Sequence, residues 1–161
     1  MSERLLEKPV WSEADFDRME WHDATIYAVG FDAASFELLF DVDYICQWLL
    51  PKNSNHYSFW VAPATLVFEN VHDICLDVES GTHLSIDRLI RTVQGRPRNS
   101  DAIGKEIDWR WTLQLQSGEI AFRSTGYTQY FRREPILTVS QRLSLPARAG
   151  MSLEKHGWSK P

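Results

Sequence analysis

The sequence predicts an all-β protein of antiparallel strands, either a sandwich or a partly closed barrel, with a short N-terminal helix. Three observations favour this class: a clear alternating hairpin, several other short alternating segments between turn residues, and few segments with helical spacing. A sandwich and a barrel both alternate inward and outward residues along each strand, so the pattern leaves both architectures open.

The clearest element is a hairpin over residues 109–122, where apolar and polar residues alternate around Ser117-Gly118. With these two residues as the turn, Trp111 would face Ser124, and each large indole would meet a small partner. This size matching predicts the register and one buried face.

In the N-terminal part, we expect residues 1–10 to be loosely ordered and a short helix to follow near 12–18. Ser12 is a good helix start, and Asp15 stands where a capping box has its acid. Two strands, 25–31 and 36–44, then form a second hairpin through a turn of small and polar residues.

In the middle of the chain, Pro51 and its polar neighbours interrupt both the helical and the strand periodicity. This predicts a surface loop over 46–57. Pro63 interrupts the next apolar run, and a proline there indicates an edge strand or a bulge. Further strands are expected over 59–61, 65–71, 74–78, 84–93 and 137–145.

The chain is expected to form one β-rich domain over residues 1–146. Residues 147–161 lack periodic apolar positions and contain Gly, Ser, Lys and Pro. They are therefore expected to form a mobile tail.

The composition narrows the classes of partner. The chain has 161 residues and a formal net charge of −5, which argues against a general nucleic-acid binder and favours a basic partner. The sequence shows neither a signal-peptide pattern nor an apolar run of membrane-spanning length. We therefore expect a cytoplasmic protein that does not interact with a membrane. Cys46 and Cys75 have no CxxC spacing and are interpreted as reduced core residues.

No familiar catalytic or cofactor motif stands in the sequence. We find no GxSxG, no phosphate-binding glycine loop, and no HxH or HExxH spacing. The expectation is a non-enzymatic protein without a cofactor or a metal site.

One polar cluster follows from the first hairpin. If Phe31 pairs with Phe36, then His22, Asp41 and Asp43 share one face of the sheet. A histidine beside two carboxylates could serve as a general base, a partial metal site or a charged recognition patch. The alternative is an ordinary solvated face.

Other candidate binding residues are aromatic or acidic. Trp48 and Trp60 bracket the loop 51–57, and Trp21 begins the first hairpin. These three could rim an exposed aromatic platform, or else hold the loop against the sheet. Asp23 points to the face opposite His22. Glu69 lies in an apolar strand and must be exposed at an edge, paired with a cation or placed in a polar pocket.

Three segments carry a resemblance to known proteins: Glu20–Ile26, with its Trp-His-Asp sequence, the acidic strand Phe40–Tyr44, and Ala64–Val71. Together they resemble small bacterial β-rich proteins, among them immunity proteins of polymorphic toxin systems. The resemblance implies a small domain that blocks a toxin by binding it and performs no catalysis.

The leading hypothesis is thus a cytoplasmic binding protein, in its most concrete form a toxin neutraliser. Its negative charges and anchors would come from Asp23, Asp41, Asp43, Glu69, Trp21, Trp48 and Trp60. The alternative is a β-barrel that binds a small ligand or performs acid-base chemistry through His22. A third hypothesis is a homodimer through an exposed edge near residues 60–71.

Overall fold

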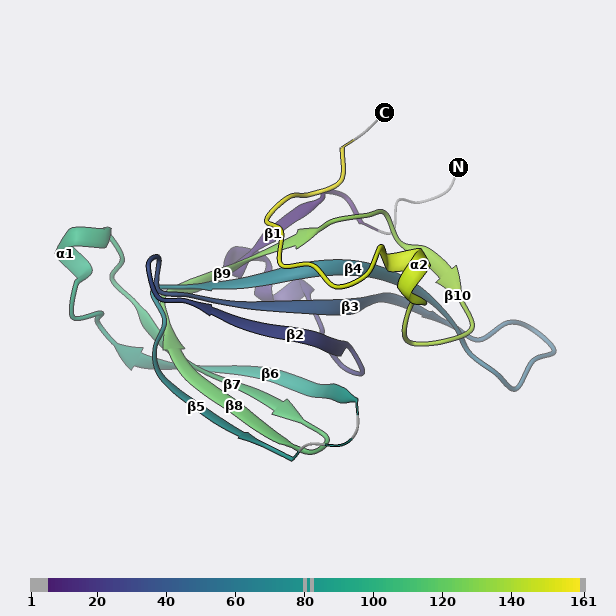
Figure 1. Ribbon diagram of the computed structural model, residues 1–161, viewed down its shortest axis with the longest axis horizontal. Helices are drawn as coiled ribbons and strands as arrows, with labels where there is room; N and C mark the ends of the chain where they lie inside the picture. The colour runs from purple at the N-terminus through teal and green to yellow at the C-terminus, as the bar shows by residue number, and fades with distance from the viewer. Residues whose placement is uncertain (1–5, 80, 82, 160–161) are drawn as a thin grey trace.

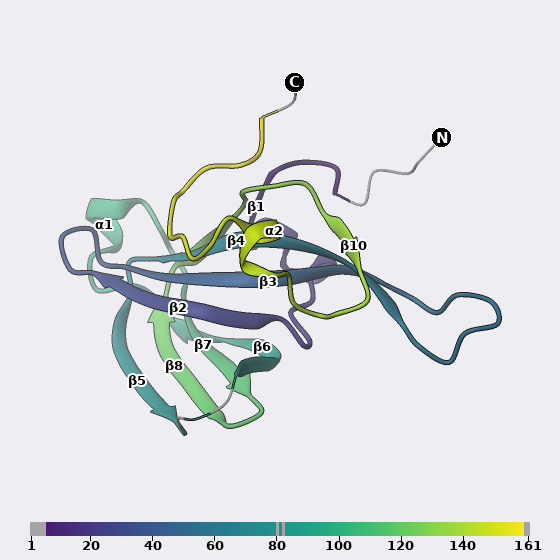
Figure 2. The ribbon, with the colours of Figure 1, turned by 45° about the vertical axis from the view of Figure 1, so that its right-hand side comes forward.

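The computed structural model describes residues 6–79, 81 and 83–159, and it is mostly antiparallel β-sheet (Figure 1). Within these residues the strands follow the order β1-β9-β4-β3-β2-β6-β7-β8-β5, with β10 beside β4. The sheet bends between β2 and β6, so that its two parts face each other as layers (Figures 1 and 2). It does not close, because β1 ends it on one side and β5 on the other.

The first layer contains β1 (Val10–Ser12), β2 (Thr25–Asp32), β3 (Glu37–Leu49), β4 (Ser58–Glu69), β9 (Gly126–Phe131) and β10 (Ile136–Thr138). The second layer contains β5 (His72–Val78), β6 (Leu84–Gly95), β7 (Asp108–Leu115) and β8 (Gly118–Ser124). The helical pieces are η1 (Glu13–Arg18), α1 (Ser100–Ile103) and α2 (Leu145–Arg148).

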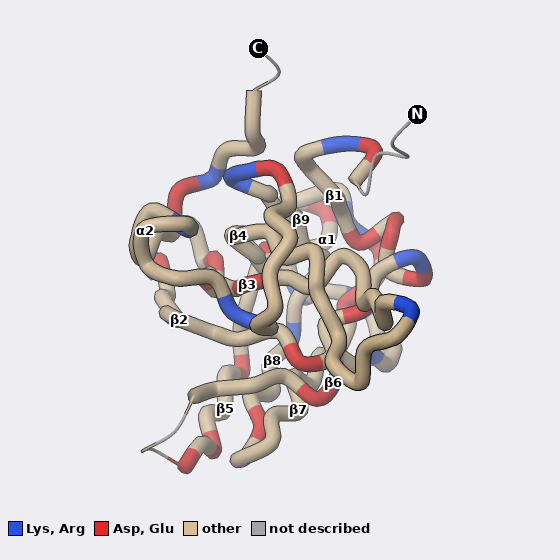
Figure 3. The backbone as a smooth tube through the Cα atoms, turned by 90° about the vertical axis from the view of Figure 1, so that its right-hand side faces the viewer, with Lys and Arg blue, Asp and Glu red and all other residues tan. Residues whose placement is uncertain are grey.

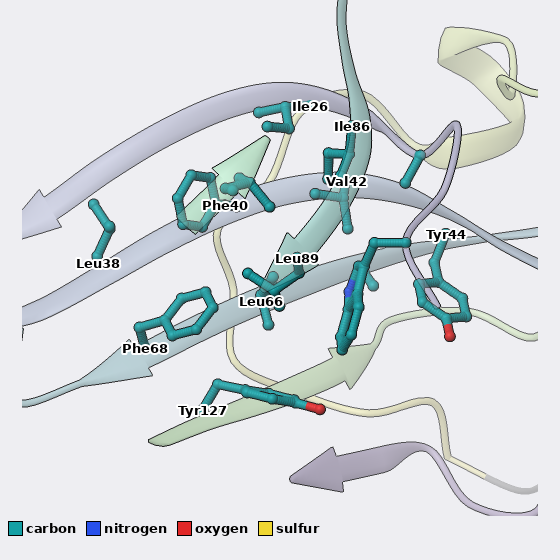
Figure 4. Packing of buried hydrophobic residues seen from close by; sticks show 14 of the residues in the cluster. Ile26, Leu38, Phe40, Val42, Tyr44, Leu66, Phe68, Ile86, Leu89 and Tyr127 are labelled. Carbon is teal, nitrogen blue, oxygen red and sulfur yellow. The ribbon is translucent and has the colours of Figure 1, made fainter. Parts of the chain in front are cut away.

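The main core fills the space between the two layers, and Figure 4 shows part of it. Phe68 of β4 packs edge-on against Phe122 of β8 and Trp111 of β7, with ring centroids 4.6 and 5.1 Å apart. All three side chains are fully buried. Because these contacts bridge the layers, the inner faces of the strands form packed core.

The 109–122 hairpin has the expected buried face but a different turn. Trp111 pairs with Phe122 rather than with Ser124, and Leu115 pairs with Gly118. The turn residues are therefore one position earlier, and Gly118 adopts the positive φ of 140° that glycine tolerates best. Since the register differs by two residues, every side chain keeps its face.

The first hairpin is also shifted from the expected register. Phe31 pairs with Leu38 and Asp32 with Glu37, so the four-residue turn lies one position later than expected. A bulge between Ile26 and Ala28 then brings Thr25 opposite Asp43. A bulge changes which residues share a face, and the proposed grouping of His22 with Asp41 and Asp43 depended on an unbroken register.

Strand β4 runs without a break through Pro63. Beside it, β9 pairs with Ala64–Glu69 and β10 pairs with Phe59–Val61. Pro63 thus lies where one neighbour gives way to the other, which is where a missing N–H costs least. Because β3 pairs with its other side, β4 is not an edge strand. The third hypothesis, a homodimer through residues 60–71, therefore has no free strand edge at β4.

Of the expected strand 137–145, only Leu137 and Thr138 are extended and paired, as part of β10 (Ile136–Thr138). The following residues, 139–159, form what we call the C-terminal segment, which crosses the outer face of β3 and β4 (Figure 2). The main-chain amide of Trp158 donates to the Phe131 carbonyl at 2.8 Å. The mobile tail expected over 147–161 includes residues 160–161, which lie outside the described residues. Main-chain and polar contacts join residues 147–159 to the sheet, although apolar periodicity is missing there.

The expected N-terminal helix near 12–18 is not matched as such, because residues 13–18 form the short 3-10 helix η1. The capping box is present: Ser12 accepts from Ala14, and Asp15 accepts from the Ser12 amide at 3.0 Å. No helix in the described ranges has the length and apolar character to cross a membrane.

Candidate functional site

Asp41 and Asp43 lie on the outer face of β3 and are fully buried under the C-terminal segment. Arg148 contacts both. Its two terminal nitrogens donate to the Asp41 carboxylate at 2.7 and 3.0 Å, and its Nε donates to Asp43 Oδ1 at 3.2 Å. The contact with Asp41 is bidentate, which is the strong form of a charge-assisted hydrogen bond between arginine and a carboxylate.

A second arginine completes the charge balance. Arg132, at the end of β9, donates to Asp41 Oδ1 at 2.6 Å and to the Thr65 hydroxyl at 2.6 Å. The Thr65 hydroxyl in turn donates to the Glu154 carbonyl at 2.7 Å. Two carboxylates and two guanidinium groups therefore cancel, which a buried site requires.

Asp43 also organises its surroundings. Its Oδ2 accepts from the Leu143 amide at 2.8 Å and from the Tyr27 hydroxyl at 2.9 Å. The Arg148 guanidinium lies over the Tyr27 ring, 3.7 Å from its centroid. Burial, followed by the charge and hydrogen bond of Asp43, raises the pKa of Tyr27 to about 12.

This buried network corrects two expectations about the acids. Asp41 and Asp43 form neither a solvated face nor a recognition patch, because both are fully buried and internally paired. They do not form a general base with His22, which lies on the surface. The sequence held one signal: two acids two residues apart in an apolar strand share a face and need cations.

His22 and Asp23 lie together just before β2. His22 Nε2 is 3.5 Å from Asp23 Oδ2, and its Nδ1 is 3.7 Å from Asp87 Oδ1. Asp23 also accepts from the Gln141 side chain at 2.9 Å. His22 therefore meets two carboxylates, but on an exposed surface and not in the mouth of a barrel.

The three tryptophans do not form one platform. Trp21 is buried in the core and donates from Nε1 to Gln129 Oε1 at 2.8 Å. Trp60 pairs with Gln47, and alternation directs it to the face opposite its neighbour Phe59. Trp48 alone is substantially exposed, at 38%.

Glu69 is the last residue of β4 and is half-buried. Its carboxylate accepts from the Thr128 hydroxyl at 3.1 Å, and its carbonyl accepts from the Ser124 hydroxyl at 2.6 Å. Since β4 is interior to the sheet, Glu69 is not exposed at an edge, and its contacts hold the corner where β8 passes into β9.

A cluster of four rings, which we call the hairpin surface, stands at the end of the β3–β4 hairpin. It consists of His22, Trp48, Tyr57 and Phe59. The Trp48 centroid lies 6.0 Å from His22 in a stacked arrangement, and 5.9 and 5.1 Å from Tyr57 and Phe59. Tyr57 is 47% exposed, so the cluster presents aromatic faces to a partner.

A groove of about 490 Å³ adjoins the hairpin surface. It follows the part of β3 that extends beyond β2, where Ile45–Leu49 pair only with β4 among the described strands. Its lining residues are Arg18, Glu20, His22, Tyr44, Ile45, Cys46 and Trp48. Aromatic rings, charges of both signs and a strand edge with unpaired backbone groups suit recognition of a polypeptide.

The groove also contains a thiol. Burial raises the pKa of Cys46 to about 12, so the thiolate is scarce at neutral pH and the group is a poor nucleophile. The described residues contain no group of three or more His, Cys, Asp or Glu side chains that could hold a metal ion. The sequence singled out Trp48 and His22 here but missed Tyr57, whose role depends on the hairpin bringing it beside Trp48.

No family model matches the chain, and searches of curated proteins and of solved structures find no match.

Proposed function

We propose that this chain is a non-enzymatic binding protein that neutralises a basic toxin-like protein by direct contact. The observation that carries the proposal is the hairpin surface beside the groove. Trp48 and Tyr57 are large, exposed and held by ring contacts. Rigid aromatic side chains of this kind supply much of the energy in protein interfaces, because little side-chain entropy is lost on binding.

Two further observations support a protein partner. The chain carries a formal net charge of −5, which favours association with a basic protein. The proposal also follows the resemblance of residues 20–26, 40–44 and 64–71 to small bacterial β-rich proteins, among them immunity proteins that block a toxin by binding it. With Asp41 and Asp43 committed to the buried network, the contact anchors of the proposal are Trp48 and Tyr57.

The proposal is tested by capture from the native host. The tagged wild-type chain and a Trp48→Ser/Tyr57→Ser variant are used as bait in parallel. Phe36→Asn is the matched control, because Phe36 is 57% exposed on the distant β2–β3 turn and asparagine tolerates its positive φ. A protein retained by the wild type and the control but lost from the double variant is then expressed alone.

We expect that protein to be basic and to arrest growth, and we expect co-expression of the wild-type chain to restore growth. The double variant should restore it poorly at equal protein level. A captured protein that does not impair growth, or growth equally restored by the double variant, would contradict the proposal.

A further inference from the structure

Strand β5 ends the sheet with a free edge. It pairs with β8 on one side, and no other described strand pairs with it. Within the seven-residue strand His72–Val78, alternate residues therefore direct their backbone donors and acceptors to the side away from β8. Leu76 is 60% exposed on this strand, which offers an apolar contact beside the unpaired backbone.

The end of this edge is acidic (Figure 3). Asp77 of β5 stands directly opposite Glu119 of β8, and exposed Glu79 follows two residues later along the chain. Among the described residues, none of these three forms an ion pair. Like charges directly opposite each other repel, so a cation placed between them would lower the energy of the edge.

We infer that the free edge of β5 binds an extended, lysine- or arginine-rich segment of the partner protein as an additional strand. This inference rests on the proposed function, since it assumes a protein partner. Main-chain hydrogen bonds along β5 would provide affinity, as in other strand additions. Basic side chains of the segment would lie beside Asp77 and Glu119, and an apolar side chain would cover Leu76.

The negative charge at the β5 edge favours a basic strand over a second copy of this chain. Edge-to-edge pairing of two β5 strands would bring the acids of both copies together, which is how charged residues keep edges apart. The same acids attract a basic strand. The edge thus excludes self-association and admits a partner of opposite charge.

The test uses a defined probe, an octapeptide with blocked ends that alternates lysine with threonine and valine. Its binding to the isotope-labelled chain is followed by amide chemical shifts and amide hydrogen exchange. A peptide with glutamate in place of lysine is the charge control. We expect shifts and slowed exchange confined to residues 73–79 and 117–120 with the lysine peptide, and none with the glutamate peptide.

Charge-reversal variants test whether the acids at this edge cause the peptide binding. Asp77→Lys/Glu119→Lys should weaken lysine-peptide binding about ten-fold or more, because repulsion replaces attraction. Asp17→Lys, at an exposed acid on η1, should leave it unchanged. Absence of shifts at β5, or equal loss with Asp17→Lys, would overturn the inference.

A last comparison separates this inference from the proposed function. The Trp48→Ser/Tyr57→Ser variant should bind the peptide normally, because its changes lie on the hairpin surface. Reduced capture of the partner by Asp77→Lys/Glu119→Lys would support the inference, and unchanged capture would overturn it while the proposed function stands. Failure of the growth test would reject toxin neutralisation, whereas the peptide shifts at β5 are measured on the chain alone and still decide whether this edge binds a basic strand.

Discussion

Arg148 and Asp41 join the C-terminal segment to the middle of the sheet. The guanidinium donates through Nη2 and Nη1 to the two oxygens of one carboxylate at 2.7 and 3.0 Å, and both side chains have no exposed surface. The residues are separated by 107 positions in the chain. This pair, shared with Asp43, is the main polar attachment of the segment.

Removing the Arg148 charge should strongly destabilise the protein. In Arg148→Met the two buried aspartates keep only Arg132 as a cationic partner, and an uncompensated buried charge typically costs about 3–5 kcal/mol. Urea unfolding followed by tryptophan fluorescence measures the change. Arg110→Met, at an exposed arginine of β7, is the control and should change stability by less than about 0.5 kcal/mol. A similarly small effect of Arg148→Met would show that the network is not structural.

Asp15 should make stability depend on acid pH. Burial raises the pKa of this carboxyl, but hydrogen bonds from Lys8 and the Ser12 amide, with the charges of Lys8 and Arg18, outweigh burial and lower the pKa below its ordinary 3.8. A lowered folded-state pKa means that the stabilisation is complete above 3.8 and disappears as pH falls through the folded value.

We therefore expect Asp15→Asn to lose about 1 kcal/mol at pH 7, the size of a capping interaction. The difference from the wild type should shrink as pH falls below 3.8. Urea denaturation at several pH values measures it. Asp17→Asn, at an exposed neighbour, is the control and should change stability at pH 7 by less than about 0.5 kcal/mol. A gap between Asp15→Asn and the wild type that is constant with pH would refute this assignment.

The two cysteines should differ in reactivity. Cys75 is exposed on β5, while Cys46 is partly covered and burial raises its pKa to about 12. A thiol-specific reagent at pH 8 should modify one thiol rapidly and the second only after unfolding. Cys75→Ser should abolish the rapid phase and Cys46→Ser should preserve it. Two rapid phases in the wild type would be inconsistent with the burial of Cys46.

Trp21 and Trp48, both expected from the sequence to bind a partner, should separate into a core residue and a surface residue. Trp21→Ala removes a side chain that is 3% exposed and should cost about 3–5 kcal/mol. Trp48→Ala removes one that is 38% exposed, and we expect a loss of about 1 kcal/mol or less. Thermal and urea unfolding of both variants test this. Equal losses would mean that Trp48 belongs to the core, which would weaken its proposed role in binding.

The sequence predicted faces better than registers. Alternation alone determines that Trp111 and Leu113 point inward, because side chains on a strand follow a period of two. The position of the turn, however, depends on Gly118 taking a positive φ as the first residue of β8, and several turns fit the same residues. In the first hairpin, the alternating pattern fits a regular strand equally well, so the bulge near Tyr27 could not be predicted from it.

The buried network could not be found from local patterns. Asp41 and Asp43 stood out as acids in an apolar strand, yet Arg148 lies 105 positions from Asp43 in a segment without periodicity. Only the fold brings these residues together. His22 and Trp48 were recognised by residue type, but their stacking depends on β3 extending past the start of β2.

The most direct test of the proposed function is amide hydrogen exchange on the chain alone and in complex with the captured growth-arresting protein. We expect slowed exchange at residues 44–59 and 20–22, which contain the hairpin surface and most residues that line its groove. Unchanged exchange throughout these residues, with protection only elsewhere on the chain, would contradict it.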